Sequence, residues 1–380
     1  MSNYDIIIIG AGPAGSMAAI TAAKKGLSVA LIDRRNRIGY PKQCAEGINK
    51  NIFSLVGLKK QDEWISNKID SLIGGTPGKG KLYLKAKRSE GYILERKVFD
   101  PALSEIAESC GANLITGTEV LSINKERVKL KNKTLNTKAI IAANGPSGSV
   151  ARMIGAEVVK NGIGLQYEIK AKSEFPHSLQ AYFGLNVINP GWAWIFPKAD
   201  TLNVGIGSFK MMNLKSHLDK FVKNVGVKGK IVETNGGLIP LHGPIKEIVH
   251  KNVLFIGDAA GHTNPVSGGG IPAAMYDGKL ASEILAEELL EKKPNFKRYE
   301  QEWEKSIFGS SMKKSLKVQK LYLDSLNKGY FDKFFGNFEF EEVTKRSDLL
   351  RILKKAPNLK ILTRFAHMGK LFAKPYEYAW

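Results

Sequence analysis

Ile6-Ile-Ile-Ile9-Gly10-Ala-Gly12-Pro-Ala-Gly15 is the stretch that decides the fold of this 380-residue chain. The apolar run ends directly at Gly10, and the small residues from Ser16 to Ala23 continue as a helix. Gly10 permits a sharp turn, Gly12 lets a pyrophosphate approach bare backbone, and Gly15 lets the helix press on the strand. The order of strand, tight turn and helix predicts a Rossmann-like dinucleotide-binding unit.

The residues that follow the glycines fit the same unit. The expected helix begins at Pro13 and Ala14, and its N-terminus supplies amide donors and partial positive charge to phosphates. The next strand ends at Asp33, whose type and spacing suit the adenosine ribose hydroxyls. Arg34 and Arg35 follow, and an arginine there leaves a nicotinamide phosphate cofactor formally open.

A second glycine motif, far downstream, decides between these cofactors. The apolar residues 253–256 form a short strand that delivers Gly257 and Asp258 onto a small-residue helix start. FAD is longer than a nicotinamide dinucleotide, and its ribityl chain must be held by a second site. An aspartate beside helix amides suits the ribityl hydroxyls. The pair of motifs therefore predicts FAD.

Composition limits the other possibilities. Two cysteines, Cys44 and Cys110, exclude a disulfide scaffold and an iron–sulfur cluster, and we expect no metal. The chain shows no N-terminal signal and no apolar run of about 20 residues, so the expected location is cytoplasmic, with a peripheral place at the inner membrane surface as the alternative. The net charge of +21 fits anionic lipid or an acidic partner, and no motif indicates nucleic acid.

We expect an α/β protein in which a β-rich substrate domain is inserted into a discontinuous FAD-binding domain. The C-terminal region, where lysines alternate with apolar residues, is expected to be a helical cap on the core, with a membrane-surface helix as the alternative. The expected segments are 1–70, 96–154 and 250–290 for FAD, 71–95 and 155–249 for substrate, and 291–380 for the helical region.

Four stretches resemble the signatures of the geranylgeranyl reductase family, whose members are FAD enzymes that saturate isoprenoid chains, including the digeranylgeranylglycerol lipids of archaeal membranes. The resemblance runs from residue 1 to about 290, and the wider superfamily has the fold of p-hydroxybenzoate hydroxylase. The stretches are Pro41-Lys-Gln-Cys44-Ala-Glu46-Gly47, Tyr92-Ile-Leu-Glu-Arg96-Lys-Val-Phe99-Asp100, Pro190-Gly-Trp192-Ala-Trp194-Ile-Phe196-Pro197, and Gly257-Asp-Ala-Ala-Gly-His-Thr-Asn-Pro265-Val-Ser-Gly268-Gly-Gly270.

The resemblance implies a set of site residues. The aromatic side chains of the third stretch share one strand face, where an isoprenoid would lie unless they are plain core. The expected FAD contacts, beyond those above, are Cys44, Ala45, Arg96, Val120, Gly268, Gly269, Gly270 and Ile271, and the expected substrate contacts are Trp192, Trp194, Phe196 and Pro197. The chain departs from the family at Ala45, Trp192 and Asn144, where glycine, tyrosine and an acidic residue are usual.

The implied chemistry needs a proton donor. An isolated alkene is a poor hydride acceptor, so a proton must arrive as the hydride leaves reduced flavin. Cys44, Glu46 and His262, or a water that they hold, are the candidates. The electron donor is expected to be NAD(P)H or a ferredoxin-like protein. The alternatives are an FAD monooxygenase or halogenase acting on an aromatic or polyketide substrate, and a lipid-binding protein with a dead flavin fold.

Overall fold

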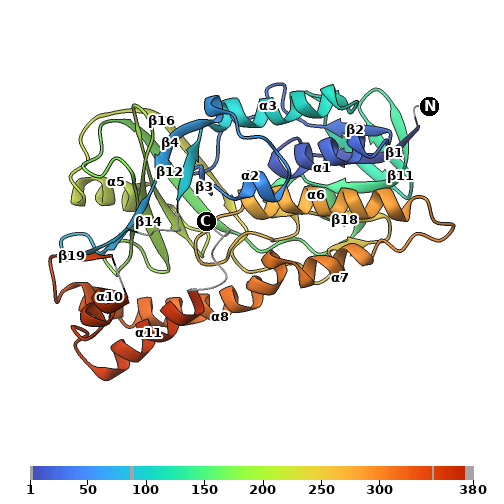
Figure 1. Ribbon diagram of the computed structural model, residues 1–380. Helices are drawn as coiled ribbons and strands as arrows, with labels where there is room; N and C mark the ends of the chain where they lie inside the picture. The colour runs from blue at the N-terminus through green and yellow to red at the C-terminus, as the bar shows by residue number, and fades with distance from the viewer. Residues whose placement is uncertain (1–2, 86–89, 345, 373–380) are drawn as a thin grey trace.

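The computed structural model describes residues 3–85, 90–344 and 346–372. Residues 86–89 of the expected β-rich segment, and 345 and 373–380 of the expected helical region, lie outside the described residues. The described parts form two sheets that stand side by side, with helices α7 (Arg298–Lys305) and α8 (Ile307–Asn327) running along beneath both (Figure 1). No helix within these ranges is long and apolar enough to cross a bilayer.

The first sheet holds the N-terminal glycine motif. Its central strand carries the run Ile6 to Ile9, at most 7% exposed, and it pairs in parallel with a strand on either side. Such a continuous apolar run is typical of a parallel strand buried on both faces. The strand order is β17-β18-β11-β1-β2-β8, with β10 and β9 forming a hairpin beside β11. The strands are β1 (Asn3–Ile9), β2 (Val29–Ile32), β8 (Asn113–Ile115), β9 (Val120–Asn124), β10 (Arg127–Leu130), β11 (Thr134–Ala142), β17 (Val249–His250) and β18 (Val253–Phe255).

The second sheet is mostly antiparallel and corresponds to the expected β-rich part. Its order is β16-β12-β15-β14-β13-β5-β6-β19. A small third sheet has the strand order β3-β7-β4. The strands of the second sheet are β5 (Ser71–Gly75), β6 (Lys81–Lys85), β12 (Gly162–Lys170), β13 (Ser178–Tyr182), β14 (Gly191–Pro197), β15 (Leu202–Ser208), β16 (Lys230–Ile239) and β19 (Phe340–Val343), and those of the third are β3 (Gly47–Asn49), β4 (Ile65–Ile69) and β7 (Gly91–Leu94).

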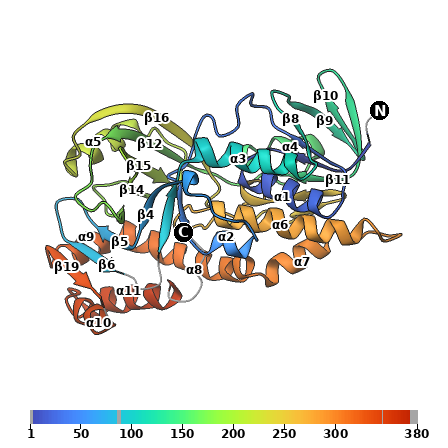
Figure 2. The same cartoon turned by 45° about the horizontal axis from the view of Figure 1, so that its top comes forward.

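The helices cover both sheets. On the first sheet α1 and α6 pack against each other, and α3 lies beside α1 (Figures 1 and 2). On the second sheet one face packs on α5 and the other on the aromatic residues of α8 and α9. The remaining helices are α1 (Pro13–Lys24), α2 (Ile52–Leu55), α3 (Arg96–Ser109), α4 (Ser149–Ile154), α5 (Lys215–Asn224), α6 (Ile271–Glu288), α9 (Tyr330–Phe335), α10 (Arg346–Leu353) and α11 (Leu359–Phe372).

The structure differs from the sequence expectations at three places. The C-terminal region contains a strand, β19, which pairs in parallel with β6 and completes the second sheet. The expected β-rich part contains α5, whose Leu218 and Phe221 pack on that sheet. Helix α3 begins at Arg96, three residues before Phe99, where the sequence predicts a helix over 99–110, so Pro101 lies inside the helix.

Candidate active site

The first glycine motif has the geometry that close phosphate approach requires. Gly10 has a φ of 108°, and a Cβ there would lie 2.3 Å from the Ala143 carbonyl oxygen. A Cβ on Gly15 would lie 1.8 Å from the carbonyl oxygen of Gly10, so only glycine lets α1 pack on the turn. A Cβ on Gly12 would meet nothing within 4 Å. The motif therefore leaves open space in front of the backbone at the start of α1, where Pro13 and Ala14 form the first turn.

Asp33 is buried at the end of β2, and Arg35 holds it. The carboxylate accepts hydrogen bonds from the Ala11 amide at 2.8 Å and from Nε and Nη2 of Arg35 at 2.9 and 2.8 Å. Burial opposes the charged form, but Arg35 and the amides outweigh it and lower the pKa of Asp33. Arg34, the predicted FAD contact, is exposed. Arg34 stays a predicted FAD contact, and the neighbour Arg35 is the residue that pairs with Asp33.

The segment that leads to Val120 lies beside Asp33. The Thr118 amide donates to the Asp33 carbonyl oxygen at 3.1 Å, and the Gly117 amide donates to that of Arg35 at 3.0 Å. Val120 is 5% exposed and begins β9. The structure thus brings this predicted FAD contact to the same end of the first sheet as Asp33.

The two glycine motifs meet through α1 and α6. A Cβ on Gly257 would lie 3.2 Å from that of Ala14, and Gly257 has a φ of 56°. The neighbouring Asp258 accepts a hydrogen bond from Thr263 Oγ1 at 2.7 Å, and a Cβ on Gly270 would lie 3.0 Å from Asp258 Oδ1. Burial raises the pKa of Asp258 above its ordinary value. A buried carboxylate of this kind is stabilised by hydroxyl donors.

These residues fit FAD. The open space at Gly12 suits the pyrophosphate, the Asp33 end suits adenosine, and Asp258 suits the ribityl hydroxyls. The loop Gly268 to Gly270, which ends at the first residue of α6, Ile271, presents backbone rather than side chains for a flavin ring. The cofactor would supply hydride chemistry at that loop.

Cys44 and Glu46 lie in the loop that connects β2 to the small third sheet. The Glu46 amide donates to Cys44 Sγ at 3.2 Å, and Glu46 has a left-handed φ of 71°. Burial raises the pKa of the Cys44 thiol, while the Arg96 guanidinium opposes that rise. The Arg96 guanidinium pairs with Asp100, with Nη2 2.5 Å from Oδ2, and its positive charge also favours the charged form of Asp258. Cys44 therefore holds its proton as a neutral thiol in the ordinary pH range.

The Glu46 carboxylate belongs to a buried ion cluster that sequence reasoning missed. Lys42 Nζ lies 2.9 Å from Glu46 Oε2 and 2.9 Å from Glu168 Oε1. Lys198 Nζ lies 2.7 Å from the same Glu46 oxygen and 2.8 Å from Glu95 Oε2. Burial alone would lower the pKa of Lys42, but the two glutamates outweigh it and raise that pKa.

This ion cluster joins the Cys44 loop to the second sheet. Glu168 lies on β12 and Lys198 follows the end of β14, so both come from the β-rich part. The Glu46 Oε1 atom additionally accepts from the Arg96 amide at 3.0 Å at the start of α3. The Gln166 side chain, also on β12, donates to the Cys44 carbonyl oxygen at 2.9 Å. The Cys44 loop is thus fixed from both sides.

The predicted aromatic face meets both loops. Trp192 and Trp194 are each 7% exposed, and a Cβ on Gly268 would lie 3.1 Å from Trp192 Cζ2. A Cβ on Gly47 would lie 3.1 Å from Phe196 Cε2. Ala45 packs into the aromatic cluster that these residues form with α8 and α9, and the Pro197 carbonyl oxygen accepts from Asn67. The Cys44 loop and the glycine loop therefore both pack on this aromatic face.

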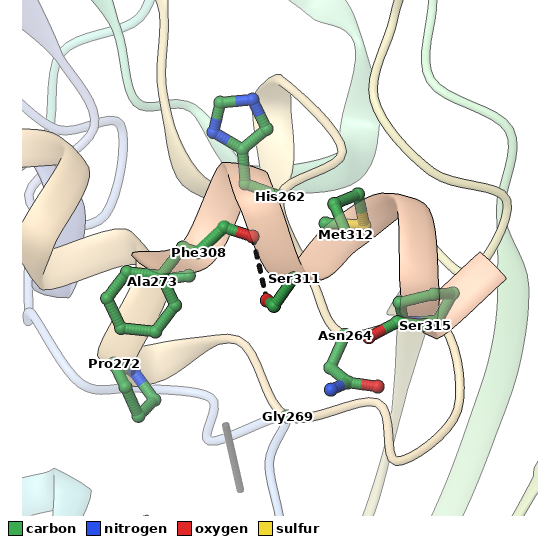
Figure 3. A pocket seen from close by; sticks show the side chains of 10 residues that line it. His262, Asn264, Gly269, Pro272, Ala273, Phe308, Ser311, Met312 and Ser315 are labelled. Carbon is green, nitrogen blue, oxygen red and sulfur yellow. Dashed lines mark hydrogen bonds between the residues drawn. The ribbon is translucent and has the colours of Figure 1, made fainter. Parts of the chain in front are cut away.

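His262 lies in a different setting. Its Nδ1 is 2.6 Å from Asp277 Oδ2, both side chains are fully buried, and its ring stacks on Trp303 with centroids 3.7 Å apart. The Nε2 atom has no hydrogen-bond partner and His262 lines a cavity of about 20 Å³, room for one water. Gly269 and the α8 residues Ser311 and Met312 line the same cavity (Figure 3). The structure brings Cys44 and Glu46 together, and it holds His262 by α6 and α7.

Comparisons with known proteins agree with this arrangement. Residues 5–183 match the family model of FAD dependent oxidoreductases, and residues 161–239 match the model of the geranylgeranyl reductase catalytic domain.

Two similar curated proteins are digeranylgeranylglycerophospholipid reductases. That of Methanococcus vannielii is 31% identical, over 94% of this chain and 96% of its own. One of those from Methanosphaera stadtmanae is 34% identical, over 95% of this chain and 98% of its own.

Solved structures share the fold. A geranylgeranyl bacteriochlorophyll reductase-like protein from Thermoplasma acidophilum superposes with a TM-score of 0.82 at 26% identity, covering 97% of this chain and all of that one. A flavin-dependent brominase superposes with a TM-score of 0.71 at 18% identity, covering 97% of this chain and 98% of that one, which shows the fold alone.

Proposed function

This chain belongs to the geranylgeranyl reductase family of FAD-dependent oxidoreductases, and we propose that it saturates the double bonds of geranylgeranyl chains in archaeal-type glycerophospholipids or their precursors. One observation carries the proposal beyond the family. The aromatic face of β14 meets the glycine loop through Trp192 and the Cys44 loop through Phe196. An apolar hydrocarbon suits the region between them, because that region is lined by aromatic rings and bare glycine backbone.

The proposed reaction adds two hydrogens across a double bond. FAD, held by the two glycine motifs and reduced, would supply the hydride for one alkene carbon. The Cys44 thiol gives its proton to the other carbon, so that two C–H bonds replace the π bond and the sulfur is left as a thiolate. The nearby Arg96 guanidinium stabilises that thiolate, and solvent returns the proton. Positive charge that develops on the tertiary carbon is stabilised by the faces of Trp192 and Trp194.

The other two proton-donor candidates receive different roles in this proposal. Glu46 is already engaged by Lys42, Lys198 and the Arg96 amide, so it positions the Cys44 loop rather than donating a proton. His262 connects the second glycine motif to α6, because its Nδ1 contacts Asp277 Oδ2. The same Asp277 oxygen accepts a hydrogen bond from the Gly257 amide at 2.8 Å. We assign it a positioning role for the flavin loop.

The proposal extends to the partners of the enzyme. NAD(P)H or a ferredoxin-like protein remains the predicted electron donor, and the net charge of +21 favours an acidic protein docking on the surface. Contact with a membrane surface is likewise proposed, because the substrate is a lipid. Reduction of the bound flavin by each donor, measured as the loss of flavin absorbance, distinguishes the two.

The test follows the flavin and the lipid together. The purified protein is reduced with dithionite without oxygen, and a digeranylgeranylglycerol phospholipid is added in detergent. We expect flavin reoxidation with a gain of two hydrogens per double bond in the lipid's mass. The Cys44→Ser variant should bind FAD normally and reoxidise about a hundredfold more slowly, the size of a lost general acid.

A different outcome would favour the alternative enzymes that share this fold. If the flavin stays reduced until oxygen is admitted, and the lipid mass does not change, the reductase proposal is wrong. Oxygen-dependent turnover of an aromatic or polyketide substrate would then indicate a monooxygenase or halogenase. The Gly12→Asp variant, expected to lack flavin, serves as the control for direct reduction of lipid by dithionite.

A further inference from the structure

We propose that an anionic membrane surface docks on the outer side of the second sheet, across that sheet from the Cys44 loop. The inference rests on the proposed function, since a lipid substrate resides in a membrane. The site is a groove between α5 and the edge strand β16, here called the outer groove, with a volume of about 580 Å³. Its apolar lining includes Ile163, Leu165, Met212 and Ile231.

The outer groove exists because α5 covers only part of the sheet. Leu218 and Phe221 of α5 pack on β12 and β15, which leaves the edge strand β16 largely exposed. The pairing of Leu165 with Gly236 places a glycine in the floor. A Cβ at Gly236 would come within 3.3 Å of Leu165 Cδ1, so the glycine keeps that floor open. The groove is therefore built into the strand pairing.

Exposed apolar side chains lie around the outer groove. Met211 is 59% exposed, and the adjacent β16 residues Ile231 and Val232 are 48% and 51% exposed. Leu238, further along β16, is 39% exposed. Isolated exposed apolar residues need no explanation, but here Ile231 lines the outer groove and the other three are next in sequence to residues that line it, which marks an interaction surface.

Lysines accompany these apolar residues. Lys210 precedes Met211, and Lys228 and Lys230 precede Ile231. All three are exposed, and no carboxylate among the described residues lies within 4 Å of their ammonium groups. The carboxylates of this area are engaged elsewhere, with Asp219 bound to Lys215 and Glu233 bound to Lys97. The surface is therefore cationic as well as apolar.

That combination selects a lipid surface over a second copy of the chain. An anionic bilayer offers hydrocarbon to Met211 and Ile231 and phosphate groups to the lysines at the same depth. A twofold contact between two copies through this face would instead bring lysines against lysines. The geometry assigns the outer groove to the membrane interface.

The test measures binding of the full-length holoenzyme to sedimenting phosphatidylcholine vesicles with and without phosphatidylglycerol. We expect binding only with phosphatidylglycerol, and weaker binding as salt is added. Lys228→Glu/Lys230→Glu should lower the partition coefficient by about 30-fold or more, the factor for two lysines at an anionic surface.

A matched variant controls for net charge. Lys292 and Lys293 are exposed in the turn after α6, at the far end of the molecule from α5 in both views (Figures 1 and 2). Lys292→Glu/Lys293→Glu carries the same charge change, and we expect less than about a threefold effect beyond the Debye length. Met211→Ser should weaken binding about fivefold by losing apolar contact, whereas Leu290→Ser, at a more exposed site away from the outer groove, should not.

Three results would overturn the inference. The first is that the parent protein does not bind anionic vesicles, and the second is that the two double-lysine variants lose equal amounts of vesicle binding. The third is that Lys228→Glu/Lys230→Glu has a lower molecular mass in solution than the parent protein, which would assign the groove to a second copy. Met211→Ser decides the matter if the lysine variant does not fold. Reduction of lipid in detergent is measured separately, so a failure of the docking surface leaves the proposed function intact, and the reverse also holds.

Discussion

Replacement of Lys42 by methionine should be among the most destabilising changes at the domain junction. The Lys42 ammonium is 1% exposed and contacts the carboxylates of Glu46 and Glu168, both at 2.9 Å. Methionine keeps most of the length of the side chain and removes its charge and its hydrogen-bond donors. The expected loss is about 3–5 kcal/mol of unfolding free energy, because removing the ammonium leaves buried carboxylates without their cation.

The arrangement of the cluster supports a value in that range. Lys42 and Lys198 face three carboxylates, those of Glu46, Glu95 and Glu168, so the cluster has one excess negative charge before the change and two after it. Lys198 lies 2.7 Å from Glu46 but 3.8 Å from Glu168, so it compensates the second carboxylate poorly. Glu168 Oε2 already lacks a hydrogen-bond partner.

The assay is equilibrium urea unfolding at neutral pH, followed by circular dichroism and tryptophan fluorescence. Lys215→Met is the matched control, since Lys215 also pairs with an acid four residues along, Asp219, but at 71% and 47% exposure. Its expected cost is about 0–1 kcal/mol. Adding Glu168→Gln to Lys42→Met should recover more than about 1 kcal/mol. The reasoning is refuted if Lys42→Met unfolds within about 1 kcal/mol of the control.

Three further outcomes are expected. Gly12→Asp should purify without FAD yet keep the thermal stability of the apoprotein, because a Cβ at residue 12 meets nothing within 4 Å. Gly15→Ala should lose both FAD and thermal stability, because its Cβ would lie 1.8 Å from a carbonyl oxygen. Flavin absorbance measures the first property and thermal unfolding the second. Burial raises the pKa of the Cys44 thiol, so as pH rises the native state keeps this proton longer than the unfolded state does. The contribution of the thiol to the unfolding free energy is full below the unfolded pKa of about 8.5 and falls as pH rises through the folded pKa. Urea unfolding at rising pH should show this decline in the parent and not in Cys44→Ala. Asp258→Asn removes a buried carboxylate of raised pKa, so it should stabilise the apoprotein at neutral pH. Because the carboxylate is the expected acceptor for the ribityl hydroxyls, the same variant should weaken FAD binding about tenfold, measured by flavin fluorescence quenching.

The cofactor half of the site was accessible from sequence because its signals are local. Gly10, Gly12 and Gly15 act within one turn, and each glycine has the backbone geometry that its spacing predicted. The second motif carried the same kind of information at Gly257 and Asp258. The fold class and the FAD cofactor followed from these local patterns, and the family followed from the resemblance of four stretches; the comparisons confirm all three.

The rest depended on contacts between distant residues. Lys42 and Glu168 are 126 positions apart, and no sequence pattern around either residue indicates a buried ion pair. The pairing of Arg35 rather than Arg34 with Asp33 rests on which side chain turns back onto Asp33, a matter of one position in a loop. Helix α5 did leave a signal, because Leu214, Leu218 and Phe221 recur at helical spacing. The roles of Cys44, Glu46 and His262 stay predictions.

The pairing of β19 with β6 has a consequence for the way the protein is made. Residues 340–343 pair with residues 81–84, so during translation the outer side of β6 stays unpaired until β19 has left the ribosome. An open strand edge invites pairing with other nascent chains. We therefore expect that a premature stop before Phe340 releases a polypeptide prone to aggregate, even though its two glycine motifs are complete.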